Sequence, residues 1–88
     1  MTAPDPAALE AEILRQTGER GAGKSICPSE VARALAPDED AWRSLMGPIR
    51  AAAIRLARQG RVEVLRKGKP VSTDAEIRGV IRLRRAAP

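Results

Sequence analysis

The chain has 88 residues, a net charge of +5, 43 % hydrophobic and 31 % charged residues, which predicts a single globular domain over residues 1–88. One cysteine excludes an internal disulfide, and without histidine it also excludes a Cys/His metal site, so we expect no metal and no cofactor. No segment has the apolar length of a membrane span and the first ten residues carry no export pattern, so we expect a cytoplasmic protein without membrane contact.

The first predicted helix covers residues 6–17. Asp5 is a good N-cap, and Pro6 suits the first helical position. Gly18 is the expected stop. The ordered core should therefore begin near residue 5, and we expect it to end near residue 85.

Residues 18–25, GERGAGKS, match the phosphate-loop pattern G-x-x-x-x-G-K-[ST]. That site needs a strand before the loop and a helix directly after the lysine, so that backbone amides and the helix dipole hold phosphates. Here a helix is predicted before the loop, and Pro28 follows four residues after Lys24. We therefore interpret the stretch as a glycine-rich connector, and we expect neither a nucleotide site nor another small-molecule substrate.

Residues 25–26 are predicted to form a short strand, followed by a helix in CPSEVARAL. Pro28 and Glu30 both suit the first turn of that helix. Cys27 stands at the helix start, where a thiol pKa can be lowered, so a redox role is one interpretation. A small buried hydrophobic side chain at the start of the helix is the interpretation that we favour.

Pro37 is expected to end this helix, and Asp38-Glu39-Asp40 should begin the next one with an N-cap and an acidic first turn. The three carboxylates could bind a metal ion. Because adjacent side chains point in different directions and no further ligand is near in the sequence, we expect no metal there.

The longest predicted helical segment is residues 41–60. Its apolar residues recur at helical spacing and form one stripe: Trp42, Leu45, Met46, Ile49, Ala53 and Leu56. Trp42 is the only aromatic residue, and we expect it to be the hub of the core. Gly47-Pro48 predicts a kink or break near residues 46–48. Arg43, Arg50 and Arg58 lie together on a flank of the helix.

After Gly60 the apolar period changes from helical to alternating. Residues 61–66 predict a strand, residues 67–70 (KGKP) a turn, and residues 80–84 a return strand in which Ile81 and Leu83 alternate with arginines. The tail from Arg85 to Pro88 is expected to fray. The predicted fold class is mainly α with a small β-hairpin (α+β), in the order of a winged helix-turn-helix domain.

The same residues carry a resemblance. The runs are ICPSEVARAL, then WR-x-LM-x-x-IR-x-A-x-x-LA-x-x-G, then V-E-V-x-x-KGKPV, and finally G-V-IRLR. Over residues 18–85 the chain resembles a small bacterial family known only as a domain of unknown function with winged-helix character. The resemblance implies the fold, and it implies no activity and no catalytic residue.

Charge is segregated along the chain. Residues 1–42 contain four Lys/Arg and eight Asp/Glu, whereas residues 43–88 contain twelve Lys/Arg and three Asp/Glu. Composition bias is an alternative, since arginine outnumbers lysine 13 to 3, but bias alone does not predict segregation. A basic half indicates a surface that faces a polyanion.

Three function classes remain. We favour binding of double-stranded DNA, for example as a small transcriptional regulator, through a helix flank and a wing tip. The candidate contacts are Arg43, Arg50, Arg58, Arg66, Lys67 and Lys69. The alternative is a module for protein–protein interaction or homodimerisation without nucleic-acid binding. An enzyme is not expected, because no histidine, carboxylate pair or cysteine–base pair is evident.

Overall fold

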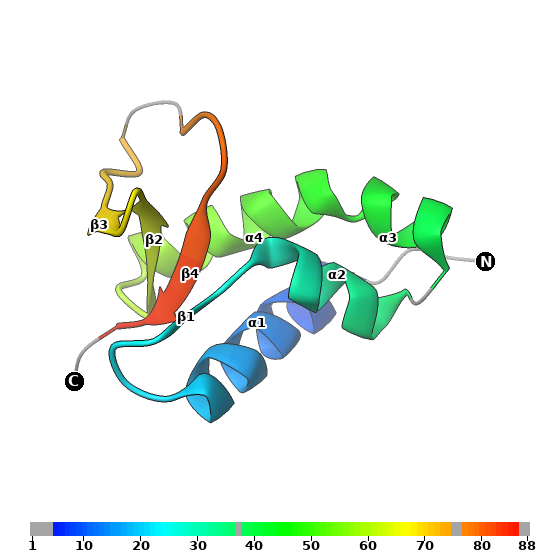
Figure 1. Cartoon of the computed structure of the whole chain (residues 1–88), viewed down its shortest axis with the longest axis horizontal. Helices are drawn as coiled ribbons and strands as arrows, with labels where there is room; N and C mark the ends of the chain where they lie inside the picture. Colours follow the sequence, from blue (N-terminus) through cyan, green and yellow to red (C-terminus); the bar gives the residue numbers. More distant parts are fainter. Residues whose placement is uncertain (1–4, 37, 75–76, 87–88) are drawn as a thin grey trace.

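The computed structural model describes residues 5–36, 38–74 and 77–86 (Figure 1). In chain order the elements are α1 (Pro6–Arg20), β1 (Ser25–Ile26), α2 (Pro28–Leu35), α3 (Glu39–Ser44), α4 (Met46–Arg58), β2 (Val62–Arg66), β3 (Lys69–Pro70) and β4 (Arg82–Arg85). The α+β class expected from the sequence is confirmed, with a four-stranded antiparallel sheet in place of a simple hairpin. No helix within the described ranges is long and apolar enough to cross a bilayer.

Helix α1 begins as predicted and ends later than predicted. The Asp5 carboxylate accepts from the Ala8 amide at 2.9 Å, which caps the first turn. The predicted stop at Gly18 is wrong: the helix continues to Arg20 and ends at Gly21, whose φ of 100° lies in the region that favours glycine. At Gly18 the missing side chain instead leaves room for Arg85, because an added Cβ would lie 2.6 Å from its Nη2.

Helix α2 is capped by its own third residue. The Glu30 carboxylate accepts from the Cys27 amide at 2.7 Å, and this hydrogen bond holds the pKa of Glu30 below its usual value. The helix ends at Leu35, and Ala36 is extended at φ −148°, as favoured for a residue before proline. The predicted stop at Pro37 lies outside the described residues.

The predicted break in the long helical segment is confirmed. Helices α3 and α4 meet at Leu45, and Pro48 falls in the first turn of α4, where its missing N–H costs no hydrogen bond. The stripe keeps its phase across the break, since Leu45 is 5 % exposed while Ile49 and Leu56 are fully buried. Both helices therefore face the same core.

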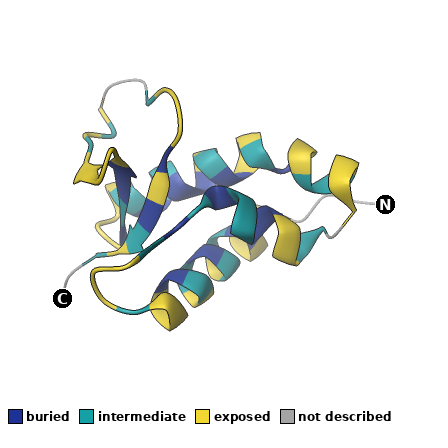
Figure 2. Cartoon of the chain, viewed as in Figure 1, coloured by how far each residue is buried: buried dark blue, intermediate teal, exposed yellow. Residues whose placement is uncertain are grey.

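The centre of the core lies between α1, α4 and the sheet, where the buried residues gather in Figure 2. Its fully buried large side chains include Ile13, Ile49, Leu56 and Leu83. The prediction that Trp42 is the hub is wrong, because the indole is only partly buried and packs against the core from α3. Arg33 and Arg43 cover its ring, with guanidinium carbons 4.6 and 5.5 Å from the ring centroid.

The sheet has the strand order β1-β4-β2-β3, so β4 lies between strands from two distant parts of the chain. Leu83 of β4 is paired with Ile26 on one side and Val64 on the other, which gives three adjacent apolar side chains on the face toward the helices. The return strand begins at Arg82, two residues later than predicted, and the alternation of buried Leu83 with exposed Arg82 is as expected.

The predicted fraying of the C-terminal tail is wrong for its first residues. Arg85 belongs to β4, its Nε donates to Thr17 Oγ1 at 3.3 Å, and its Nη2 donates to the Leu14 carbonyl. The Ala86 amide donates to the Arg61 carbonyl at 3.1 Å. The end of β4 is therefore bonded to the last turns of α1, and the prediction for residues 87–88 falls outside the described part of the chain.

Candidate nucleic-acid interface

The six predicted DNA contacts come from three elements. Arg43 lies on α3, and Arg50 and Arg58 lie on α4. The other three, Arg66, Lys67 and Lys69, belong to the β2–β3 hairpin and are exposed. In Figure 1 the hairpin and the last turns of α4 lie at one end of the molecule, and α3 lies at the other.

Arg50 and Arg66 approach the same glycine from two elements. Arg50 donates to the Gly79 carbonyl from Nη1 at 2.9 Å and to the Ile77 carbonyl from Nη2 at 2.6 Å. Arg66 lies against Gly79 from the sheet, since a Cβ added there would stand 3.2 Å from its Nη2. Gly79 has a φ of +82°, a backbone conformation that favours glycine. The structure thus brings a helix arginine and a hairpin arginine together.

Arg58 joins this group further along α4, where its Nη2 donates to the Thr73 carbonyl at 3.1 Å. We call Arg50, Arg58 and Arg66 the loop arginines, because all three lie against the segment that connects β3 to β4. Backbone carbonyls are neutral acceptors and a guanidinium stays protonated, so the hydrogen bonds of Arg50 and Arg58 position these two cations without cancelling their charge.

The hairpin itself is a tight two-residue turn. Lys67 and Gly68 both have positive φ, 51° and 80°, between the paired residues Arg66 and Lys69. Two positive φ angles are the mark of a type I′ turn, which suits the twist of a hairpin. Lys67 and Lys69 are exposed, and neither has an ion pair within the described residues.

Arg43 is the one predicted contact that the structure does not bring to the others. Its Nη2 is 3.1 Å from Glu39 Oε1, and its guanidinium also lies over Trp42. A carboxylate neighbour offsets its charge, and Asp38 and Asp40 stand exposed in the same first turn. The start of α3 is therefore an acidic surface.

Sequence reasoning missed Arg82 as a functional candidate. Its guanidinium donates to Ser25 twice, from Nε to Oγ at 2.7 Å and from Nη2 to the carbonyl at 3.0 Å, so this charge is also fixed by neutral acceptors. The alternation of apolar residues with arginines in residues 81–84 was the available signal, because it places Arg82 on the outer face of the sheet.

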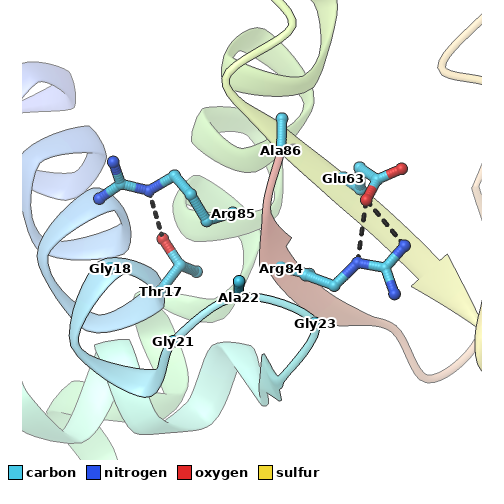
Figure 3. A pocket seen from close by; sticks show the side chains of 9 residues that line it. All are labelled: Thr17, Gly18, Gly21, Ala22, Gly23, Glu63, Arg84, Arg85 and Ala86. Atoms are coloured by element: carbon cyan, nitrogen blue, oxygen red, sulfur yellow. Dashed lines mark hydrogen bonds and ion pairs between the residues drawn. The ribbon is translucent and has the colours of Figure 1, made fainter. Parts of the chain in front are cut away.

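The glycine-rich connector has a different geometry from a phosphate loop. Gly18 lies inside α1, Lys24 is followed by β1, and the Lys24 amide donates to the Gly21 carbonyl at 3.2 Å. The connector borders a cavity of about 290 Å³ beside β2 and β4 (Figure 3). There Arg84 donates to Glu63 at 2.9 Å, and Arg85 also lines the cavity, where its Nε donates to Thr17 Oγ1.

Neither candidate metal nor redox chemistry gains support from the local geometry. Among residues 5–36, 38–74 and 77–86, no group of His, Cys, Asp and Glu side chains lies close enough to hold a metal ion. Cys27 is half-buried at the start of α2, where its sulfur accepts from Ser29 Oγ at 3.1 Å.

A comparison with family models gives one finding. A model described as "Protein of unknown function (DUF3253)" matches residues 6–86, a span that begins with α1 and ends just after β4. No curated protein matches the chain. The match supplies no activity, ligand or site residue, so function has to be inferred from the geometry.

Proposed function

The chain belongs to the DUF3253 family, and from its geometry we propose that it is a winged-helix protein that binds double-stranded DNA in the cytoplasm. The surface that we assign to DNA consists of the loop arginines together with Lys67 and Lys69. The proposal includes no catalytic activity, cofactor or metal.

The order of the elements supports the winged-helix assignment. Helices α2 and α3–α4 follow each other as in a helix-turn-helix unit. Strands β2 and β4 pair with each other and form the wing together with the segment that connects them. Strand β1, between α1 and α2, pairs with β4 and completes the small sheet beside the helices. The CPSEVAR run covers the N-cap and first turns of α2, WR-x-LM covers the junction of α3 and α4, and IRLR leads into β4. The residues behind the resemblance therefore lie on elements that define this arrangement.

The observation that carries the DNA proposal is the bonding of the loop arginines. Arg50 and Arg58 donate to backbone carbonyls, and the guanidinium of Arg66 lies against Gly79. The hydrogen bonds hold Arg50 and Arg58 in place, and both side chains keep their full charge. A cation that is already ordered loses less side-chain entropy on binding a phosphate than a mobile one does. Each phosphate contact also releases counterions from the DNA.

The acidic start of α3 changes how the molecule meets DNA. Asp38, Glu39 and Asp40 repel phosphates, so we assign the main contact to the α4 flank and the hairpin rather than to the first turn of α3. Arg43 then contributes least among the six predicted contacts, because Glu39 is its ion-pair partner.

The test is a salt titration of binding to a mixed-sequence DNA duplex, followed by fluorescence anisotropy. We expect the logarithm of the affinity to fall linearly with the logarithm of salt concentration. Lys67→Ala and Lys69→Ala should each reduce the slope by about one. Arg15→Ala is the matched control, because Arg15 lies on α1 and pairs with Glu12 and Glu19.

Two results would contradict the proposal. The first is no binding at about 50 mM salt, where electrostatic association is strong. The second is that Lys67→Ala, Lys69→Ala and Arg15→Ala all change the salt slope by the same amount.

A further inference from the structure

A second feature of the sheet end is a groove of about 460 Å³ on the outer face of the sheet. Leu65 and Val80 provide its apolar surface, and Arg66, Lys67 and Arg82 provide its cations. It differs from the cavity beside the glycine-rich connector, which contains a glutamate.

The apolar part of the groove is unusual for an outer strand face. Leu65 is paired with Arg82 across β2 and β4, and it lies outside the main core cluster although it is only 5 % exposed. Val80 is 83 % exposed and is the large hydrophobic side chain most open to solvent in the described chain. Both side chains line the groove, so the exposed surface of Val80 is open to contact with a bound partner.

The charged part of the groove is of one sign. The guanidinium of Arg82 is held by Ser25, and Lys67 has its position set by the tight turn. Among the described residues that line the groove there is no carboxylate. Glu30, outside the lining, interacts with the charge of Arg82, whereas Arg66 and Lys67 have no carboxylate partner among the described residues.

We propose that this groove binds an acidic protein segment that inserts one aliphatic side chain between Leu65 and Val80. Flanking carboxylates of the segment pair with Arg66, Lys67 and Arg82. The groove is concave, so it accepts a protruding side chain, whereas a DNA groove accepts a protruding protein element. The groove contains no aromatic side chain on which an unpaired base could stack.

The bound acidic segment also competes with DNA, because Arg66 and Lys67 belong to both surfaces. This competition rests on the proposed function, whereas the binding of the segment does not. Carboxylates placed on these two cations cancel charge that phosphates would otherwise use. The acidic segment would thereby act as a negative regulator of DNA binding.

The test uses the full-length ¹⁵N-labelled chain and capped model peptides. The probe is acetyl-EDLDE-amide, and acetyl-EDGDE-amide is the matched peptide with the same charge and no aliphatic side chain. We expect shift changes at the amides of Leu65, Val80 and Arg82 with the leucine peptide, and at least about fivefold weaker binding of the glycine peptide.

Two variants separate the apolar and the ionic contributions. Val80→Ser should weaken the leucine peptide by about five- to tenfold with no loss of fold, because Val80 is exposed. Arg82→Gln should weaken both peptides. Arg61→Gln is the matched control, an exposed cation outside the groove, and should leave both affinities unchanged.

Three outcomes would overturn the inference. The first is equal binding of the leucine and glycine peptides. The second is a concentration-dependent dimer in sedimentation that Val80→Ser abolishes, which would make a second copy the occupant. The third is a loss of DNA affinity in Val80→Ser as large as in Lys67→Ala. If the chain binds the leucine peptide as described but no DNA, the groove inference stands and the proposed function fails.

Discussion

Arginine has different partners at the two ends of the molecule. At the helical end, Arg43 of α3 bonds to a glutamate, and so do Arg15 and Arg20 in the last turns of α1. At the sheet end, Arg50 and Arg58 bond to neutral backbone carbonyls.

This difference teaches that composition alone does not locate a charged surface. An ion pair cancels most of the field of its arginine, whereas a carbonyl fixes the guanidinium and leaves its field intact. Arg55 and Arg84, which pair with Glu10 and Glu63, are the exceptions at the sheet end. The effective positive surface is therefore smaller and more localised than the twelve cations of residues 43–88 suggest.

The largest expected effect concerns which end holds the core. Leu83→Ala removes a fully buried side chain between β1 and β2 and should lower the free energy of unfolding by about 3–4 kcal/mol. Trp42→Ala should cost only about 1–2 kcal/mol, because the indole is partly buried. Urea unfolding followed by far-UV circular dichroism measures both. An equal or larger loss for Trp42→Ala would place the core at the helical end.

The next effect tests whether a carbonyl-bonded arginine contributes more than an ion-paired one. Arg50→Ala loses the hydrogen bonds to Ile77 and Gly79 and should lower the free energy of unfolding by about 1 kcal/mol. Its DNA affinity should also fall by about fivefold at 100 mM salt. Arg15→Ala, in the same assays, should change stability by less than about 0.5 kcal/mol, as is usual for an exposed ion pair. Similar losses in the two variants would remove the distinction between the ends.

A pH titration tests the capping carboxylate at the start of α2. The Cys27 amide and then Arg20 hold the pKa of Glu30 below its usual 4.5, so this carboxylate stabilises the fold above that pH. The contribution is lost as pH falls through the lowered pKa of the folded state. Glu30→Gln should be about 1 kcal/mol less stable than the native chain at pH 7, and the difference should shrink toward pH 3. A difference that does not change with pH would show that the charge of Glu30 is unimportant.

The smallest expected effect is on DNA binding by Arg43. It lies at the end of the molecule away from the hairpin, beyond the Debye length of about 8 Å at 0.15 M salt. Arg43→Ala should therefore alter DNA affinity by less than about twofold, whereas Lys67→Ala should weaken it by about threefold. Anisotropy titrations at 150 mM salt compare the two variants. A larger effect of Arg43→Ala would show that the start of α3 belongs to the DNA-binding surface.

Local signals predicted most of the elements. The Asp5-Pro6 start, the break before Pro48 and the alternation of residues 81–84 depend on neighbours in the chain, and the structure agrees with each of them. The end of α1 was mispredicted because Gly18 serves a contact with Arg85, a residue that is distant in sequence. A glycine that makes room for a side chain cannot be distinguished from a helix stop by its neighbours alone.

The candidate site was less predictable, because it depends on which groups the loop arginines meet. The sequence places Arg43 and Arg50 on one helix flank, but it does not reveal that one meets Glu39 and the other meets Gly79. The sequence overstates the role of Trp42, because a lone indole is the natural candidate for the centre of a core. Isoleucine and leucine side chains from α1, α4 and the sheet fill that centre instead.

The two outer strands of the sheet have a consequence for aggregation. β1 has only two residues, and β3 consists of Lys69 and Pro70, so neither border offers a continuous row of free backbone donors and acceptors. Fibril growth by the stacking of strands from successive molecules would have to begin on one of these borders. We therefore expect the folded protein to stay dispersed at high concentration and to form amyloid only after β4 has separated from its neighbours.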